Sequence, residues 1–348
     1  MGVAMRQGGR AAMDFMVGIT AASRPLAVQW GTALSEAGVT ADALPEDIDR
    51  RHDMINSALA GSNAFSISNL VMEFASVEHG RVARTAFDEM ADVLVPELAA
   101  LEQKGPATLT VRQDFVPPDY YKGVWFHRTT GGWNGHDEMG FIHSELIHKT
   151  YVARNFGGDI FAQRRAVLGL LPRADYTRIC EMGTSSGHFT TALQETFPDA
   201  HITGVELALP MLREALRVAN ANGWRWDLHQ AAAEDTGFEA GRFDLVASYI
   251  ILHEMPAQAI RATFAEAFRL LEPGGQMLMS DVTPYRKLDR LGAWRADALA
   301  NKGGEPYWRE AATMDWSQAA RDAGFVDVSE GSLGDAVYPW VVIGTKPA

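Results

Sequence analysis

The chain has 348 residues, of which 47% are hydrophobic and 22% charged, as in an ordinary globular protein with apolar residues for one or two buried cores. Its 44 acidic residues outnumber its 31 basic ones and give a net charge of -13. A surface of this sign repels phosphate backbones, so we exclude a general nucleic-acid binder and expect a small-molecule substrate.

The same composition favours a reducing compartment. Cys180 is the only cysteine and lies in an apolar run, so no intramolecular disulfide can form. Asp14 and Arg24 interrupt the apolar residues near the N-terminus, which therefore do not resemble a secretory signal peptide. No stretch approaches the roughly 20 apolar residues of a membrane-spanning helix. We expect a soluble, cytoplasmic protein without a membrane partner.

From about residue 10 to residue 104 the chain shows helical periodicity. Apolar residues recur at spacings of three and four, as at Phe65, Leu70 and Phe74. We predict that residues 1–106 form a mainly helical N-terminal domain, and that this domain provides the interface of a homodimer.

Residues 107–149 have a different character. Short β-like runs at 109–111 and 123–126 precede a loop rich in aromatic residues, histidines and glycines. Long loops inside compact domains usually form lids or binding surfaces, so we predict a substrate lid here, with an exposed decorated loop as the alternative. The candidate substrate-binding residues in and just after this lid are Tyr121, Trp125, His127, Arg128, Trp133, His143, His148 and Tyr151.

Strand and helix patterns alternate in the remaining segment, residues 150–348, after a helical stretch at 141–156. This alternation predicts parallel βαβ units and an α/β fold with a Rossmann-like, doubly wound sheet. The expected strands are 178–183, 201–206, 224–230, 243–250, 275–282, 325–331 and 338–345, and the expected helices include 159–172, 189–196, 210–221, 256–271 and 316–323. The last two strands are joined by a short turn-rich link and should form an antiparallel hairpin at one edge.

The first of these strands runs into a glycine-bearing turn, residues 181–187, with the sequence EMGTSSG. No Gly-Lys-Ser/Thr follows, so a P-loop is excluded, and a dinucleotide-binding turn is the nearer competitor. Glu181 at the strand end suits a ligand with a cationic amino group and no pyrophosphate. Glu206, at the end of the next strand, is placed to accept hydrogen bonds from two ribose hydroxyls.

Further motifs follow in order: GVELALPML at 204–212, AAEDTGF at 232–238, FDLVASYIILHEMP at 243–256 and LLEPGGQMLMSDV at 270–282. With the turn, they resemble class I S-adenosylmethionine-dependent methyltransferases over roughly residues 150–348. The resemblance implies that S-adenosylmethionine is the cofactor. The cofactor-binding residues that follow from it and from the turn are Glu181, Gly183, Ser185, Gly187, Glu206, Leu207, Glu234 and Asp235.

Two positions depart from the common pattern of that family. Ser185 replaces a frequent glycine, and Ala232 stands where many members have aspartate, which weakens the adenine contact expected of Glu234 and Asp235. The competing interpretation is a doubly wound domain that uses these turns for packing alone.

The candidate catalytic residues are His253 and Glu254, just past the fourth strand of the sheet, where open α/β sheets place their crevice. Methyl transfer from a sulfonium needs alignment above all, and a base when the acceptor has a proton to lose. A similar leucine-histidine-acid stretch supplies the base in plant-type O-methyltransferases. The alternative is a histidine that only caps or packs.

A second group of candidate substrate residues, Tyr307 and Trp308, lies near Trp294 and Glu305. Aromatic surroundings suit an apolar or aromatic acceptor, or one that becomes cationic. We expect no metal: His143, Glu145 and His148 have the residue types, but positions five apart share no α-helical face. Arg128, Lys149 and Arg154 could receive a substrate carboxylate or be solvated charges.

The leading hypothesis is a methyltransferase of a small molecule, most generally at a hydroxyl. One alternative is S-methylation of a thioether acid such as 4-methylthio-2-hydroxybutyrate, because the length and lid composition are similar to those of bacterial S-methyltransferases of dimethylsulfoniopropionate synthesis. Such an enzyme would need a cationic clamp for the carboxylate and no base. Another alternative is a non-catalytic protein that binds the cofactor.

Overall fold

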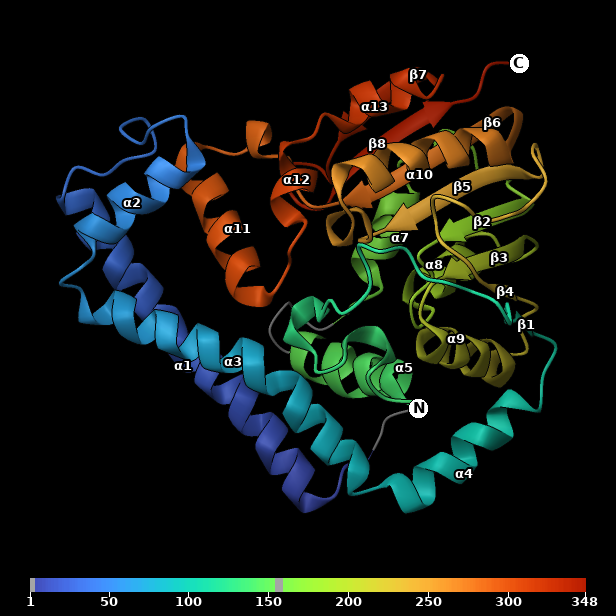
Figure 1. The fold of residues 1–348 in the computed structure, drawn as a ribbon, viewed down its shortest axis with the longest axis horizontal. Coiled ribbons are helices and arrows are strands. Elements are labelled where there is room, and N and C mark those ends of the chain that lie inside the picture. The colour runs from blue at the N-terminus through green and yellow to red at the C-terminus, as the bar shows by residue number, and fades with distance from the viewer. Residues whose placement is uncertain (1–3, 154–158) are drawn as a thin grey trace.

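The computed structural model describes residues 4–153 and 159–348. An open sheet with helices on both faces forms one part of the molecule, and a frame of long N-terminal helices lies beside it (Figure 1). Arg154, a candidate carboxylate-binding residue, and the predicted turn at Gly157 and Gly158 lie outside the described residues.

The sheet has eight strands in the order β1-β4-β3-β2-β5-β6-β8-β7, and all neighbours are parallel except the two pairs that involve β8. The strands are β1 (Thr108–Thr110), β2 (Arg178–Met182), β3 (His201–Glu206), β4 (Asp227–Gln230), β5 (Phe243–Tyr249), β6 (Leu271–Asp281), β7 (Val326–Gly331) and β8 (Trp340–Thr345). The predicted doubly wound sheet and C-terminal hairpin are confirmed. The strand order reverses between β2 and β5, which is where such sheets open a crevice at their carboxyl ends.

Helices bury both faces of this sheet. On one face lie α7 (Ala162–Leu168), α8 (His188–Thr196) and α9 (Leu209–Asn222), and on the other α10 (Ala257–Leu270), α12 (Trp308–Thr313) and α13 (Trp316–Asp322). Every residue of β5 is buried, as expected of a central parallel strand covered twice. This rigid layer fixes the strand ends on which the candidate site is built.

The N-terminal segment is helical, as predicted. It comprises α1 (Gln7–Glu36), α2 (Ile48–Ala58), α3 (Asn63–Asp88) and α4 (Ala91–Glu102), with the long α1 and α3 packed together. The later helix α11 (Arg290–Gly303) packs against α2 and α3. Trp294 of α11 meets Trp30 of α1 at 5.9 Å between ring centres, in a core remote from the sheet, so its role is in joining the two halves.

Two expectations for the lid segment are wrong: the β-like run at 123–126, and the assumption that the helix carrying His143 and His148 is an α-helix, in which residues five apart share no face. The β-like run at 123–126 is a turn followed by the 3-10 helix η1 (Phe126–Arg128), because His127 and Arg128 have positive φ angles and reverse the chain. After η2 (Gly132–Asn134) and α5 (Met139–Phe141), the segment η3 (Ile142–Val152) is a π-helix. Its hydrogen bonds span five residues, so residues five apart share a face. The rings of His143 and His148 accordingly lie 4.3 Å apart.

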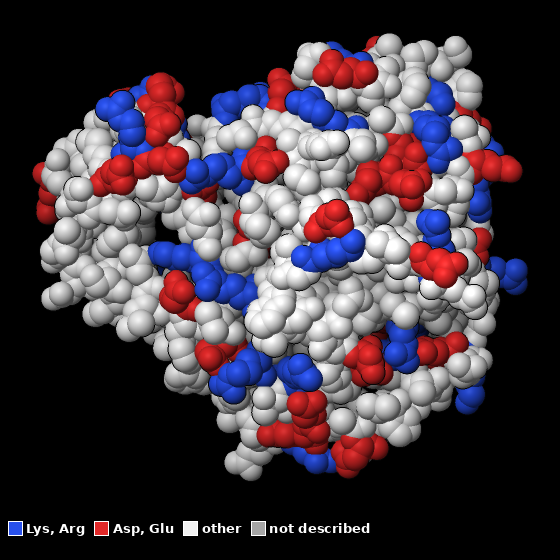
Figure 2. Space-filling model, viewed as in Figure 1, with Lys and Arg blue, Asp and Glu red and all other residues white. Residues whose placement is uncertain are grey.

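Among the described residues, no helix combines the length and the apolar composition needed to cross a membrane. On the face seen in Figure 2, lysine and arginine side chains alternate with aspartate and glutamate, and no continuous basic stripe crosses this face.

A buried ionic network joins the N-terminal helices and the lid to the sheet domain. Arg217 of α9 is buried and contacts Glu102 of α4, Glu138 before α5 and Glu214 of its own helix. Arg213 makes a second contact with Glu102, at 3.0 Å. Burial raises the pKa of Glu214 to about 8. The network therefore depends on the guanidinium that satisfies several buried carboxylates at once.

Replacing Arg217 with alanine leaves these carboxylates buried without their cation, so we expect the free energy of unfolding to fall by about 3–5 kcal/mol. Arg213→Ala is the matched control, because Arg213 is more exposed and should contribute at most about 1 kcal/mol. Urea denaturation of both variants measures the difference. Equal losses of stability would contradict a structural role for the buried network.

Candidate active site

The turn after β2 is shaped by glycines and by one serine in a left-handed conformation. Gly183, Ser185 and Gly187 have φ angles of 77°, 49° and 88°. A Cβ on Gly183 would lie 2.4 Å from the side chain of Ile251, and the backbone N–H of Gly183 donates to Val205 at 2.8 Å. The turn is thereby held against β3 and the end of β5, with its backbone open to a ligand.

Two carboxylates flank the turn. Glu206 accepts hydrogen bonds from the backbone N–H groups of Ser185 at 3.0 Å and Ala208 at 2.9 Å, which lock its orientation at the end of β3. Glu181 is buried at the end of β2, where one oxygen accepts from Thr190 and the other, Oε1, has no partner. An unpartnered buried carboxylate oxygen is a costly feature that a cationic ligand would satisfy.

A cavity of about 680 Å³ begins at this turn and extends to the lid. At the turn it is lined by Glu181, Gly183, Ser185, Glu206 and Leu207, and at its far side by Tyr120, Tyr121, His127, Trp133, His143, His148, Glu254 and Trp308. Most of the predicted cofactor and substrate residues thus face one space.

In the predicted adenine segment, Ala231 and Ala233 line the cavity. Glu234 is half-buried behind them, and Asp235 is exposed. An adenine contact by these two acids stays a prediction, and the alanines offer the apolar surface on which a flat ring could pack.

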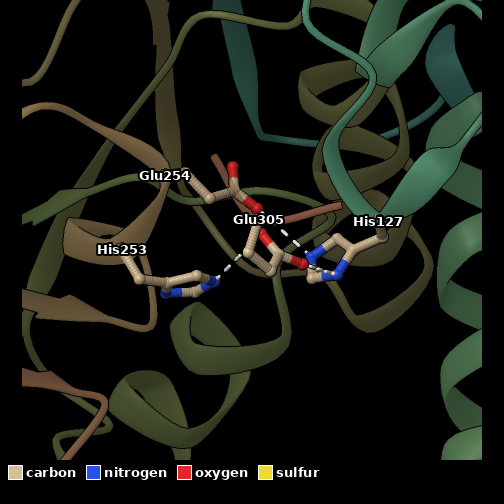
Figure 3. Close-up of side chains that lie close together, drawn as sticks. All are labelled: His127, His253, Glu254 and Glu305. Atoms are coloured by element: carbon tan, nitrogen blue, oxygen red, sulfur yellow. Dashed lines mark ion pairs between the residues drawn. The ribbon is translucent and has the colours of Figure 1, made fainter. Parts of the chain in front are cut away.

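At the far side of the cavity, four side chains from three separate parts of the chain converge (Figure 3). We call them the His–Glu cluster, and its members are His127, His253, Glu254 and Glu305. His127 contacts both acids, with its Nδ1 beside Glu305 and its Nε2 3.3 Å from Glu254. His253 Nε2 lies 3.9 Å from Glu305 Oε2.

The predicted catalytic residue His253 occupies the inner side of this cluster, with 2% of its surface exposed. Its Nδ1 lies 2.8 Å from the buried carboxylate of Asp281. Burial alone would lower the pKa of His253, but Asp281, Glu305 and Glu254 outweigh it and raise the pKa to about 9. Glu254 is the neighbour that lines the cavity, and it accepts a hydrogen bond from Trp133 Nε1 at 3.1 Å.

Four predicted substrate residues do not line this cavity: Trp125, Arg128, Tyr151 and Tyr307. Trp125 is 53% exposed because the turn at Gly123 directs it to solvent. Arg128 donates to the Lys302 carbonyl, and Tyr307 donates to the Tyr120 carbonyl at 2.8 Å.

Tyr151 lines a second cavity of about 550 Å³ between α1, α3 and η3. It stacks there on His79, with 5.9 Å between the ring centres. His127, Trp133, His143 and His148 line both cavities, so the two spaces meet at the lid.

Sequence analysis missed a group at the Glu181 end of the cavity. Arg164 of α7 and His188 of α8 line the cavity near Glu181, and the His188 ring stacks on His148 at 5.0 Å. Burial and the neighbouring Arg164 hold the pKa of His188 well below its usual value. The sequence does show a pair of basic residues, Arg164 and Arg165, in the helix before β2. Helical periodicity alone does not reveal that one of them lines a cavity.

Comparisons with known proteins agree with this arrangement. Residues 179–275 match a family described as a methyltransferase domain. Malonyl-(acyl-carrier protein) O-methyltransferase of Legionella pneumophila is 29% identical over 147 residues, 42% of this chain and 48% of that protein. Demethylmenaquinone methyltransferase of Thermus thermophilus is 32% identical over 133 residues, 38% of this chain and 59% of that protein. The chain spans about half the length of these relatives.

Among solved structures, human N-acetylserotonin methyltransferase in complex with S-adenosylmethionine is 13% identical over 100% of both chains, with a TM-score of 0.49. The matched domain and relatives confirm the resemblance seen in the motifs: the chain carries a class I methyltransferase domain, and the cofactor of that domain is S-adenosylmethionine.

The electrostatics of Glu181 predict how cofactor binding depends on pH. Burial raises the pKa of Glu181 to about 8, against the opposing effects of Thr190 and Arg164, so the free protein is mostly protonated there at pH 7. A cationic amino group requires the ionised carboxylate. Affinity for S-adenosylmethionine should therefore rise, by up to about tenfold per pH unit, between pH 6 and 8. It should level off above pH 8, where the α-amino group of the ligand also titrates.

Calorimetry across this range measures the effect. Glu181→Gln should bind more weakly at pH 8 and lose most of the pH dependence, whereas Glu195→Gln, on the exposed side of α8, should keep the wild-type profile. A wild-type affinity independent of pH would show that Glu181 does not hold the amino group.

Proposed function

We propose, from the class I S-adenosylmethionine-dependent methyltransferase domain that this chain carries, that the protein is an enzyme that transfers the cofactor's methyl group to a hydroxyl of a small molecule. The supporting observation is that the cofactor turn and the His–Glu cluster face the same cavity. A cofactor held at the turn and an acceptor held at the cluster would meet inside it.

Alignment is the main requirement for methyl transfer, because the sulfonium is already a good leaving group. The acceptor would lie among Tyr121, Trp133 and Trp308, whose rings suit an apolar or aromatic body. Its hydroxyl would donate a hydrogen bond to Glu254, which the Trp133 indole holds in place. The oxygen then attacks the methyl carbon as its proton passes to Glu254, and the C–S bond breaks with its electron pair on sulfur.

S-methylation of a thioether acid would need basic side chains that bind the acid's carboxylate. Two of the basic residues predicted for this role are engaged elsewhere, which favours hydroxyl methylation. Arg128 is bonded to the Lys302 carbonyl and paired with Glu73, and Lys149 is paired with Glu145. Neither of these side chains lines the cavity; the arginine that does, Arg164, lies near Glu181 and not in the His–Glu cluster. A thioether would also have no proton to give to the acidic cavity wall. A non-catalytic cofactor binder would need no cluster of this kind beside the cofactor.

The proposed role of the His–Glu cluster predicts a lower kcat when its residues are replaced. Glu254→Gln should lower kcat by about 10²–10⁴-fold, because it removes the group that receives the acceptor hydroxyl. His253→Ala should also lower kcat, because it removes the buried imidazole that helps to hold the cluster together. The dissociation constant for S-adenosylmethionine should stay at the wild-type value. S-adenosylhomocysteine formation, measured with an acceptor found in a screen of hydroxylated small molecules, gives the rate.

His201→Ala is the matched control, since His201 is exposed at the opposite end of the sheet and pairs with Asp227. It should keep the wild-type kcat. Turnover of thioether acids but not of hydroxylated compounds, or an unchanged kcat in both cluster variants, would contradict O-methylation at this wall.

A further inference from the structure

The His–Glu cluster has the composition and the geometry of a metal centre. We propose that it binds one divalent transition-metal ion, and that this ion takes an oxygen of the methyl acceptor. The inference rests on the proposed function for the identity of the oxygen ligand, but not for the binding of the ion. It concerns a group of residues different from His143, Glu145 and His148, for which sequence spacing opposed a metal.

The distances suit a small ion. One nitrogen or oxygen from each of the four side chains lies within 4.8 Å of the corresponding atoms of the others. Around an ion with ligand distances of about 2.1 Å, ligands on opposite sides are roughly 4 Å apart, so small side-chain rotations bring all four into contact. Two imidazole nitrogens and two carboxylate oxygens are ligands for ions such as Zn²⁺, Co²⁺, Fe²⁺ and Mn²⁺.

Asp281 prepares His253 as a ligand. Its carboxylate is fully buried, faces His253 Nδ1 at 2.8 Å and accepts the backbone N–H of Val282 at 2.7 Å. His253 Nδ1 therefore keeps its proton, and a bound ion would displace the proton of Nε2, the nitrogen aimed at Glu305. A carboxylate behind a histidine is the usual outer support of a metal-bound imidazole.

Glu305 supplies an independent sign of a missing partner. Its side chain is 5% exposed, and its Oε2 is buried without a hydrogen bond, 3.9 Å from His253 Nε2. The carboxylates of Glu305, Glu254 and Asp281 outnumber the two imidazoles, and in the described part of the chain none of the three forms an ion pair with lysine or arginine. A cation placed between them would remove this excess of buried negative charge.

The backbone around the cluster is held in a costly conformation that serves its geometry. His127 and Arg128 both have positive φ angles, near 52°, which are rare for residues with side chains. Gly304 makes this possible: a Cβ there would lie 2.7 Å from the Arg128 side chain and 3.0 Å from its backbone nitrogen. The strained turn thus packs directly against the residue before Glu305 and brings His127 to it.

The cluster is closed on its inner side and open to the cavity. His253 and Glu305 are buried, whereas His127 and Glu254 line the cavity that begins at the cofactor turn. An ion held by these four ligands has its open position on the cavity side. There it would coordinate the acceptor oxygen and lower the pKa of its hydroxyl, so that the proton passes more readily to the other carboxylate oxygen of Glu254 as the oxygen bonds to the methyl carbon.

Metal binding can be tested without an acceptor. The chelator-treated full-length chain is titrated with Co²⁺, whose visible absorption reports nitrogen and oxygen ligands, and metal content is measured after gel filtration. We expect saturation at one Co²⁺ per chain. A wild-type protein that binds S-adenosylmethionine but no Co²⁺ would overturn the metal centre while leaving the proposed function standing.

Variants locate the site. Glu305→Gln and His127→Ala should each weaken Co²⁺ binding by at least about tenfold, with S-adenosylmethionine affinity retained as the check of folding. His52→Ala is the matched control, because His52 also faces a buried carboxylate, Asp297, at 2.8 Å, but outside the cluster. Equal Co²⁺ affinity in the wild type and the two cluster variants would place the ion elsewhere and refute the assignment.

A turnover measurement tests the role given to the ion. Removal of the metal should lower kcat and leave cofactor affinity unchanged, and added Co²⁺ or Zn²⁺ should restore the rate. Full activity in the chelator-treated chain would show that the ion does not act on the acceptor.

Discussion

Carboxylates buried around one cavity are the constraint on which the site depends. Glu181 at the cofactor turn and Glu305 at the far wall each carry an oxygen that is buried and without a partner. Such oxygens cost stability unless a cation or a donor satisfies them. The protein therefore places a buried carboxyl group at each end of the cavity. We propose that the cationic methionine part of the cofactor satisfies the carboxyl group at one end, and that the metal ion satisfies the one at the other.

The rest of the fold supports these two ends differently. The cofactor end is built on the carboxyl ends of β2 and β3, where the parallel sheet fixes Glu181 and Glu206 directly. The acceptor end is assembled from loops and from the lid. The Arg217 network ties this lid to α9 and α4, and the packing of α11 on the N-terminal helices anchors the segment that leads to Glu305.

The parts of the site that sequence reasoning recovered are those encoded locally. The turn at 181–187 and Glu206 belong to consecutive strands, and their spacing already places them at one crevice. The lid was less predictable, because a π-helix at Ile142–Val152 changes which residues share a face and so joins His143 to His148. Sequence spacing had opposed a shared site for these two residues, because an α-helix was assumed.

Only half of the His–Glu cluster could be predicted from the sequence, because its other members meet through non-periodic structure. His253 and Glu254 follow a strand and could be predicted, and Glu305 was noted only as a neighbour of aromatic residues. The approach of His127 to Glu305 depends on the turn at 127–128 and on Gly304, which no periodic pattern encodes. Arg164 likewise reaches the cavity only through the packing of α7 against α8.

The most direct test of this account is a crystal structure of the chain with S-adenosylhomocysteine. We expect that its amino group contacts Glu181, that its ribose contacts Glu206, and that its sulfur points along the cavity toward Glu254 and His127. A product bound outside this cavity, or with its sulfur directed away from the His–Glu cluster, would contradict the assignment of that wall to the methyl acceptor.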